Sequence, residues 1–168
     1  MAGRARLPQL LLPLLAAASA PAAAVTQNAT VNANVVRPLT LVSQQDLDLG
    51  TIILTLGTWS GATVGISRAG VFTCNPEVVC TGAPQVARYK VTGTNKMVVK
   101  ITAPNVTLVN QSDSTKTLTL TLDSPGTVTL TSSGEPGNTF ELGGSITLSS
   151  MTTQGTYSGT LAVTVDYQ

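Results

Sequence analysis

The sequence lacks histidine altogether, and this absence excludes the commonest catalytic arrangements. Histidine is the usual general acid or base near neutral pH, so Ser-His-Asp and Cys-His schemes cannot be built here. The two cysteines alone are too few ligands for a structural zinc site. We therefore expect that the protein is not an enzyme and that it has neither a metal site nor a cofactor.

Charged residues are scarce as well, at 10% of the chain. Arg4 and Arg6 lie in a segment that we expect to be removed, which leaves seven basic and eight acidic residues and a net charge of −1. This balance argues against a nucleic-acid partner or an anionic membrane held by bulk charge. Aromatic residues make up only 4%, so Val, Leu, Ile and Ala must build the core, and the abundant Thr favours strands.

Residues 1–24 have the pattern of a signal peptide. Arg4 and Arg6 give a positive start, residues 7–18 form a short apolar stretch, and Ala22 and Ala24 satisfy the small-residue rule for cleavage. A membrane-spanning helix would need roughly 20 apolar residues. We expect an exported chain that begins at Val25 and has no integral membrane segment.

Residues 25–168 are expected to form one all-β domain, because hydrophobic residues alternate with polar ones at period two and no amphipathic helix is evident. Gly, Pro, Ser and Asn clusters roughly every 8 to 12 residues favour an immunoglobulin-like antiparallel β-sandwich. The predicted strands are 29–36, 39–42, 47–54, 62–67, 85–92, 97–103, 117–122, 127–130, 139–148 and 156–167.

The two ends of this domain have the clearest alternation. In the N-terminal strand or arm, residues 25–36, one face is small and apolar, with Ala29, Val31, Ala33 and Val35, and the other is polar and uncharged. In the C-terminal strand, one face carries Tyr157, Leu161, Val163, Val165 and Tyr167. Both segments are therefore expected to pair within a sheet.

Cys74 and Cys80 are predicted to form a disulfide, since an oxidising compartment follows from export. The bond would close a small loop and contribute about 2 to 3 kcal/mol.

Two other features suggest chemistry but have simpler interpretations. Asp46 and Asp48 point to the same face of a strand, as a glycosidase or a calcium site would require, yet solvated carboxylates on an outer face have the same spacing. Trp59 stands in a glycine-rich loop, where it either stacks on a carbohydrate or packs against the end of the domain.

Three segments resemble a family of small exported bacterial proteins known only as domain of unknown function 4402. They are PLTL (38–41), DLDLGTI (46–52) and the C-terminal GTYSGTLAVTVDYQ (155–168). GGSITL (143–148) fits the same family. The resemblance implies an exported β-domain and carries no activity with it.

The C-terminal strand also resembles that of chaperone-usher pilus subunits, including the archaic, spore-coat-like type. Tyr167 is penultimate and Gly155 is the fourteenth residue from the end, as in those subunits, and LGTI (49–52) resembles their Phe-Gly-Thr-Ile-like run with Leu in place of the aromatic residue. The resemblance implies an incomplete sandwich whose open groove is completed by a strand from another chain.

Under this resemblance, Ala29, Val31, Ala33 and Val35 would be donated to a neighbouring copy in a head-to-tail polymer. Gly155, Leu161, Val163, Val165 and Tyr167 would border the groove and meet a periplasmic chaperone before an outer-membrane usher. The protein would cross the periplasm and reach the cell surface or the medium. The alternative is a complete, self-contained surface or secreted sandwich with an adhesive or carbohydrate-binding role, because alternation is the same whichever chain supplies the partner strand.

Overall fold

The computed structural model describes residues 25–168, so the predicted signal peptide, residues 1–24, lies outside the described part. The chain divides into two units at residues 34 and 35. Residues 25–39 contain no strand, although a strand is predicted over residues 29–36. A strand is held by hydrogen bonds to a neighbouring strand, and no described strand pair includes these residues.

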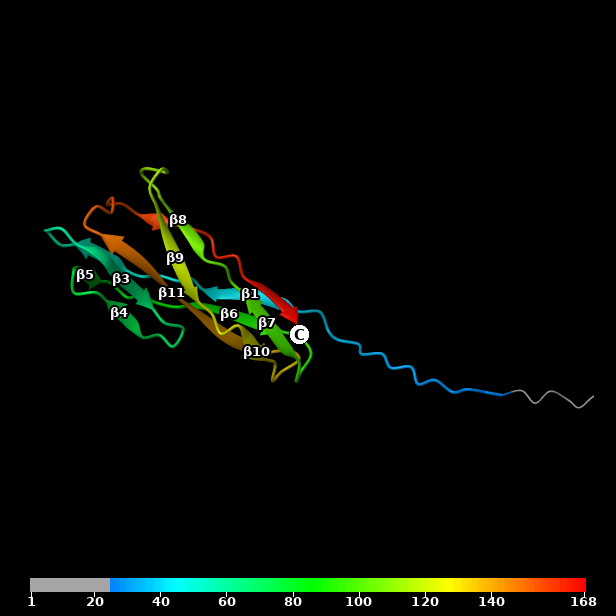
Figure 1. Ribbon diagram of the computed structural model, residues 1–168. Coiled ribbons are helices and arrows are strands. Elements are labelled where there is room, and N and C mark those ends of the chain that lie inside the picture. The colour runs from blue at the N-terminus through cyan, green and yellow to red at the C-terminus, as the bar shows by residue number, and fades with distance from the viewer. Residues whose placement is uncertain (1–24) are drawn as a thin grey trace, which may run out of the picture. The chain divides into compact units, whose positions relative to one another are not determined.

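The second unit, residues 35–168, is built around six strands that curl into a half-barrel (Figure 1). In spatial order these are β1 (Thr40–Gln45), β6 (Ala87–Thr92), β11 (Asn138–Ser149), β9 (Thr117–Asp123), β8 (Val106–Asn110) and β12 (Tyr157–Ser158). Two further strands extend this sheet from β11, namely β3 (Ser60–Ile66) and then β4 (Phe72–Cys74).

Two smaller sheets complete the unit. One has the order β10 (Thr127–Thr129), β7 (Val98–Thr102) and β13 (Thr164–Tyr167), and the other pairs β2 (Thr51–Leu54) with β5 (Val78–Thr81). Every strand pair is antiparallel, which confirms the all-β, antiparallel part of the prediction. Among residues 25–168, no helix is long and apolar enough to span a membrane.

Strand β11 connects the two halves of the core. Its first part pairs with β6 and its last part with β3, while Gly143 to Ser145 also pair with β9. Its inward side chains alternate as the sequence predicts: Phe140 and Leu142 enter one cluster, and Ile146 and Leu148 enter the other. One long strand thus contributes to both hydrophobic clusters.

The first cluster gathers β6, β7 and β11 around fully buried Val91, Val99 and Leu142, with Tyr89 stacked on Phe140 at 5.6 Å between ring centroids. The second cluster lies under β3, β5 and β9. Its buried members are Ala62, Val64, Val78, Val106, Leu120, Ile146 and Leu148. Aliphatic residues dominate both clusters, as the low aromatic content requires.

Two further predicted strands need correction. The predicted strand over residues 47–54 is formed only as β2, because Gly50 has φ +73° and lies so close to Thr81 that a Cβ atom would be 2.6 Å from its carbonyl oxygen. The predicted strand over residues 156–167 is divided into β12 and β13, which pair with different strands. Strands β4, β5 and β8 were not predicted.

Candidate functional site

Seven strands in the second unit pair on one side only among the described residues: β4, β5 and β10, and also β1, β2, β12 and β13. β1 pairs only with β6, and β2 only with β5. β12 pairs only with β8, and β13 only with β7. Each of these strands therefore retains a row of backbone N–H and C=O groups that can pair with a further strand.

Several apolar side chains along these edges are half-buried. On the C-terminal side, Leu161, Val163, Val165 and Tyr167 alternate with exposed residues, which confirms the predicted alternation even where the strand is interrupted. Leu41 and Leu47 are half-buried on the other side. Leu47 and Leu161 pack against both hydrophobic clusters, so the two edges border the same core.

A closed ring of hydrogen bonds joins the beginning of β1 to the end of β13. The Arg37 N–H donates to Thr94 Oγ1 at 2.7 Å, the Thr94 N–H donates to the Tyr167 hydroxyl at 2.7 Å, and that hydroxyl donates to the Arg37 carbonyl at 2.6 Å. Below it, Tyr167 and Leu39 approach buried Gly93 so closely that a Cβ there would be 2.5 Å from the Tyr167 oxygen. We call Arg37, Thr94 and Tyr167 the Arg37 ring.

Gly155 has a structural role beside its place in the predicted site. It has φ +143°, and a Cβ atom would lie 2.5 Å from the side-chain nitrogen of Asn110. The Asn110 side chain is buried, donates to the Gln154 carbonyl and accepts from the Ser112 N–H. Gly155 therefore allows the chain to pass over this amide and enter β12.

The four predicted donor residues lie in the segment without strands. Val31 and Val35 are each 89% exposed, and Ala29 and Ala33 are also exposed. Nothing in the described structure pairs with these residues, so their role as a donated strand stays a prediction.

The predicted disulfide is present between Cys74 and Cys80. Cys74 ends β4 and Cys80 lies in β5, so the bond links the β3–β4 ladder to the β2–β5 ladder. Between the cysteines, Asn75 forms a turn by accepting the Glu77 N–H on its side chain. The bond thus joins two sheets that share no ladder.

Replacing both cysteines by serine should lower the free energy of unfolding by about 2 kcal/mol, because the loop closed by the bond is short. Urea unfolding followed by circular dichroism measures this change. The unaltered chain unfolded with a reducing agent should match the double variant. Equal stability of the oxidised chain and the double variant would contradict the prediction.

Asp46 and Asp48 are exposed and do not converge on a shared site. The Asp48 carboxylate accepts the Gly50 N–H at 2.8 Å, which shapes the turn before β2. Asp46 is near enough to Tyr89 to contribute, after burial, to raising the pKa of that phenol. Within residues 25–168, no group of three or more His, Cys, Asp or Glu side chains is placed to hold a metal ion.

Trp59 is half-buried and packs against the second cluster. Its indole N–H donates to the Thr55 carbonyl at 3.2 Å. This placement agrees with packing at the end of the domain, the simpler interpretation.

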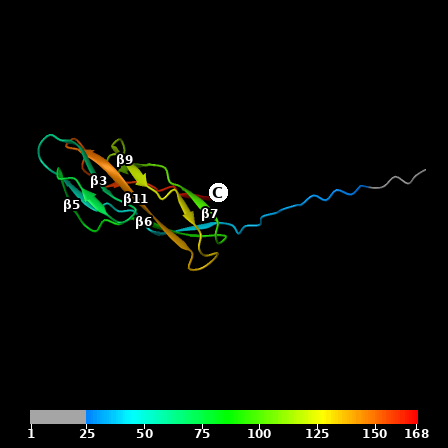
Figure 2. The same ribbon diagram turned by 60° about the horizontal axis from the view of Figure 1, so that its bottom comes forward.

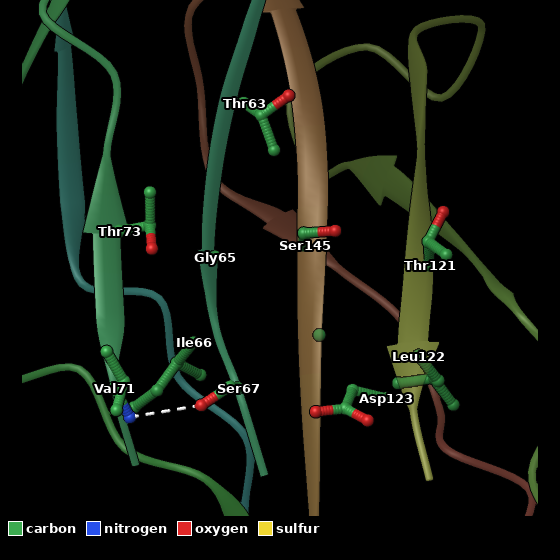
Figure 3. A pocket seen from close by; sticks show the side chains of 11 residues that line it. Thr63, Gly65, Ile66, Ser67, Val71, Thr73, Thr121, Leu122, Asp123 and Ser145 are labelled. Carbon is green, nitrogen blue, oxygen red and sulfur yellow. Dashed lines mark hydrogen bonds between the residues drawn. The ribbon is translucent and has the colours of Figure 1, made fainter. Parts of the chain in front are cut away.

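A shallow depression of about 440 Å³ lies on the outer face of β4, β3, β11 and β9 (Figure 3). Small residues form its floor, namely Gly65, Gly144 and Ser145, and threonines from β3, β4 and β9 line it. No aromatic side chain lines it. The depression therefore lacks the stacking platform that is typical of carbohydrate sites.

The fold and its edges define an antiparallel β-domain with apolar, unpaired borders. The sequence model described as "Domain of unknown function (DUF4402)" matches residues 39–167. The chain belongs to this family, which confirms the first resemblance. No curated protein and no solved structure matches the chain significantly.

Proposed function

We propose that the protein is a structural cell-surface subunit that polymerises by exchanging β-strands between copies. In this proposal the second unit is an immunoglobulin-like sandwich lacking one strand, and residues 25–36 of a neighbouring copy supply it. The inserted strand would lie between the edges of β1 and β2 on one side and those of β12 and β13 on the other.

One observation carries the proposal. The arm, residues 25–36, has an alternating apolar face and no paired strand, and the same chain has two apolar borders, β1 with β2 and β12 with β13, that lack a strand on one side. Ala29, Val31, Ala33 and Val35 would cover Leu41, Leu47, Leu161 and Val163 and bring them out of water. Each fully buried valine contributes about 1.5 kcal/mol or more, and backbone hydrogen bonds to both edges add to this.

Before assembly the same edges would have to be bound by another protein, because exposed apolar strand edges promote aggregation. A periplasmic chaperone that pairs with β13 would provide it, and an outer-membrane usher would then exchange it for the arm. Gly155 to Tyr167 would be the segment that the chaperone contacts. In this proposal the protein acts by strand pairing and performs no catalysis.

A synthetic peptide with residues 25–36 tests the proposal directly. The acceptor is the chain from Val25 carrying Val31→Asp, whose own arm should not insert. We expect the fluorescent peptide to bind this chain saturably, because its four apolar residues fill the place of the missing strand. Fluorescence anisotropy measures binding.

Two altered peptides serve as controls. The Val31→Asp peptide should bind at least about a hundredfold more weakly, since it places a carboxylate among apolar side chains. The Asn32→Asp peptide carries the same charge on the opposite face and should bind nearly as well as the parent. Equal binding of both altered peptides would refute a face-specific inserted strand.

A further inference from the structure

The β2–β3 and β11–β12 connections lie at the end of the second unit opposite its C-terminus, near β3 and β5 (Figures 1 and 2), and each exposes a large apolar side chain. Leu56, in the β2–β3 connection, is 101% exposed, and Met151, in the β11–β12 connection, is 88% exposed. Ile53 and Val79 form a cross-strand pair between β2 and β5 and are 51% and 50% exposed. We call these four residues the end patch.

Hydrogen bonds connect the loops that carry the end patch. The Ser150 N–H donates to the Trp59 carbonyl at 3.0 Å, which joins the loop of Met151 to that of Leu56. The Thr55 hydroxyl donates to the Glu77 carbonyl at 2.6 Å and ties the β2–β3 connection to the turn before β5. The apolar residues are thus presented by loops that are bonded to one another.

The opposite end of the unit carries the Arg37 ring. The ring fixes both backbone groups of Arg37, and Val36 is the only residue between Arg37 and Val35, the last member of the arm's alternating apolar face. One residue spans at most about 3.6 Å. If Val35 is inserted into a neighbouring copy, the two domains therefore have no linker between them and must touch.

Which end of the acceptor is touched depends on the direction of the inserted arm. Both unpaired borders extend between the Arg37 ring and the end patch. The chain runs through β1 and β2 from Arg37 to Leu56, and through β12 and β13 in the opposite direction, from Met151 to Tyr167. An arm that leaves the acceptor at its ring would bring two rings together and produce a closed, reciprocal dimer. An arm that leaves at the end patch would produce an open filament.

We infer that the end patch is a docking surface for the Arg37 end of a second copy of this chain. The inference rests on the proposed function and adds a second interface to it. Large exposed apolar residues grouped at one end are typical of a contact surface. Pro38 is exposed beside Arg37 and supplies apolar surface to meet the patch.

The double variant Leu56→Asp with Met151→Asp tests this surface in the chain from Val25. Both side chains are exposed, so the variant should fold as the parent does. We expect the concentration needed for filament formation to rise at least about tenfold, because two desolvated carboxylates would oppose the contact. Light scattering with electron microscopy measures assembly.

Val71→Asp is the matched control, since Val71 is 64% exposed in the β3–β4 connection and lies outside the end patch. It should assemble as the parent does. The arm peptide should bind equally well to Val31→Asp chains with and without the end-patch substitutions, which separates strand insertion from docking.

Unchanged assembly by the double variant, or closed dimers formed by the parent chain, would overturn the docking surface while leaving strand exchange in place. Failure of the arm peptide to bind any acceptor would instead refute the proposed function, and the docking surface would be refuted with it.

Discussion

A chain carrying Val31→Asp should remain monomeric under conditions in which the parent chain assembles into filaments. Val31 is at the centre of the alternating arm, with Ala29 and Ala33 on either side. Insertion would place the new carboxylate against apolar side chains such as Leu161 and Val163, where it has no partner. Burying an unpaired charge costs several kcal/mol, so subunit affinity should fall by at least about a hundredfold, as for the altered peptide. Size-exclusion chromatography with light scattering measures the effect.

Asn32→Asp is the control for this prediction, because it adds the same charge one residue along the same arm but on its polar face. It should assemble like the parent. The unfolding free energy of the Val31→Asp monomer indicates where the arm belongs. If the parent chain never assembles and the Val31→Asp variant is less stable than the parent by several kcal/mol of unfolding free energy, the arm completes its own domain. That result would contradict strand exchange between copies.

Gly143→Ala should destabilise the second unit by about 3 kcal/mol, at the upper end of the usual effect of overpacking. Gly143 lies in β11 at the point where its partner changes from β6 to β3. A Cβ there would collide with the Ile66 carbonyl oxygen and come within 2.5 Å of the Arg68 nitrogen. These are backbone atoms, which cannot rotate away as a side chain can, so the strands would have to separate.

Gly134→Ala provides the matched control, because no atom lies within 4 Å of a Cβ atom at that position. Its stability should stay within about 0.5 kcal/mol of the parent. Urea unfolding of both variants measures the difference. Equal stability of the two variants would show that β11 can move away from residues 66–68 at little cost.

Alternation predicted the strands that carry most of the core, but not the short ones. The predicted strands over residues 62–67, 85–92, 97–103 and 139–148 correspond to β3, β6, β7 and β11. Strands β4 and β5 have three and four residues, too few for a period to be evident, and they exist through their pairing with β3 and β2. Gly143 and Gly144 are a turn signal by composition, yet they lie within β11, where the backbone of residues 66–68 approaches Gly143 and the side chains of Leu47 and Leu120 approach Gly144.

For the candidate site, the sequence predicted only what the alternation within a single strand determines, namely which side chains face inward. Alternation gave the inward face of the C-terminal segment, including Leu161 and Val163, but not the break between β12 and β13, because a period says nothing about which strand is the partner. The pairing of Cys74 with Cys80 was predicted from local sequence and is confirmed, whereas export stays a prediction. The Arg37 ring joins groups far apart in sequence and had no local signal.

The Arg37 ring determines how a mechanical load would pass through the protein. A pull on the arm reaches the domain at Arg37, whose carbonyl is bound by the Tyr167 hydroxyl, so the tension divides between β1 and β13. The ladders of β1 with β6 and of β13 with β7 would then resist the pull together. The bonds of the ring involve backbone groups and two hydroxyls and no ion pair, so dissolved salt would not weaken this anchorage.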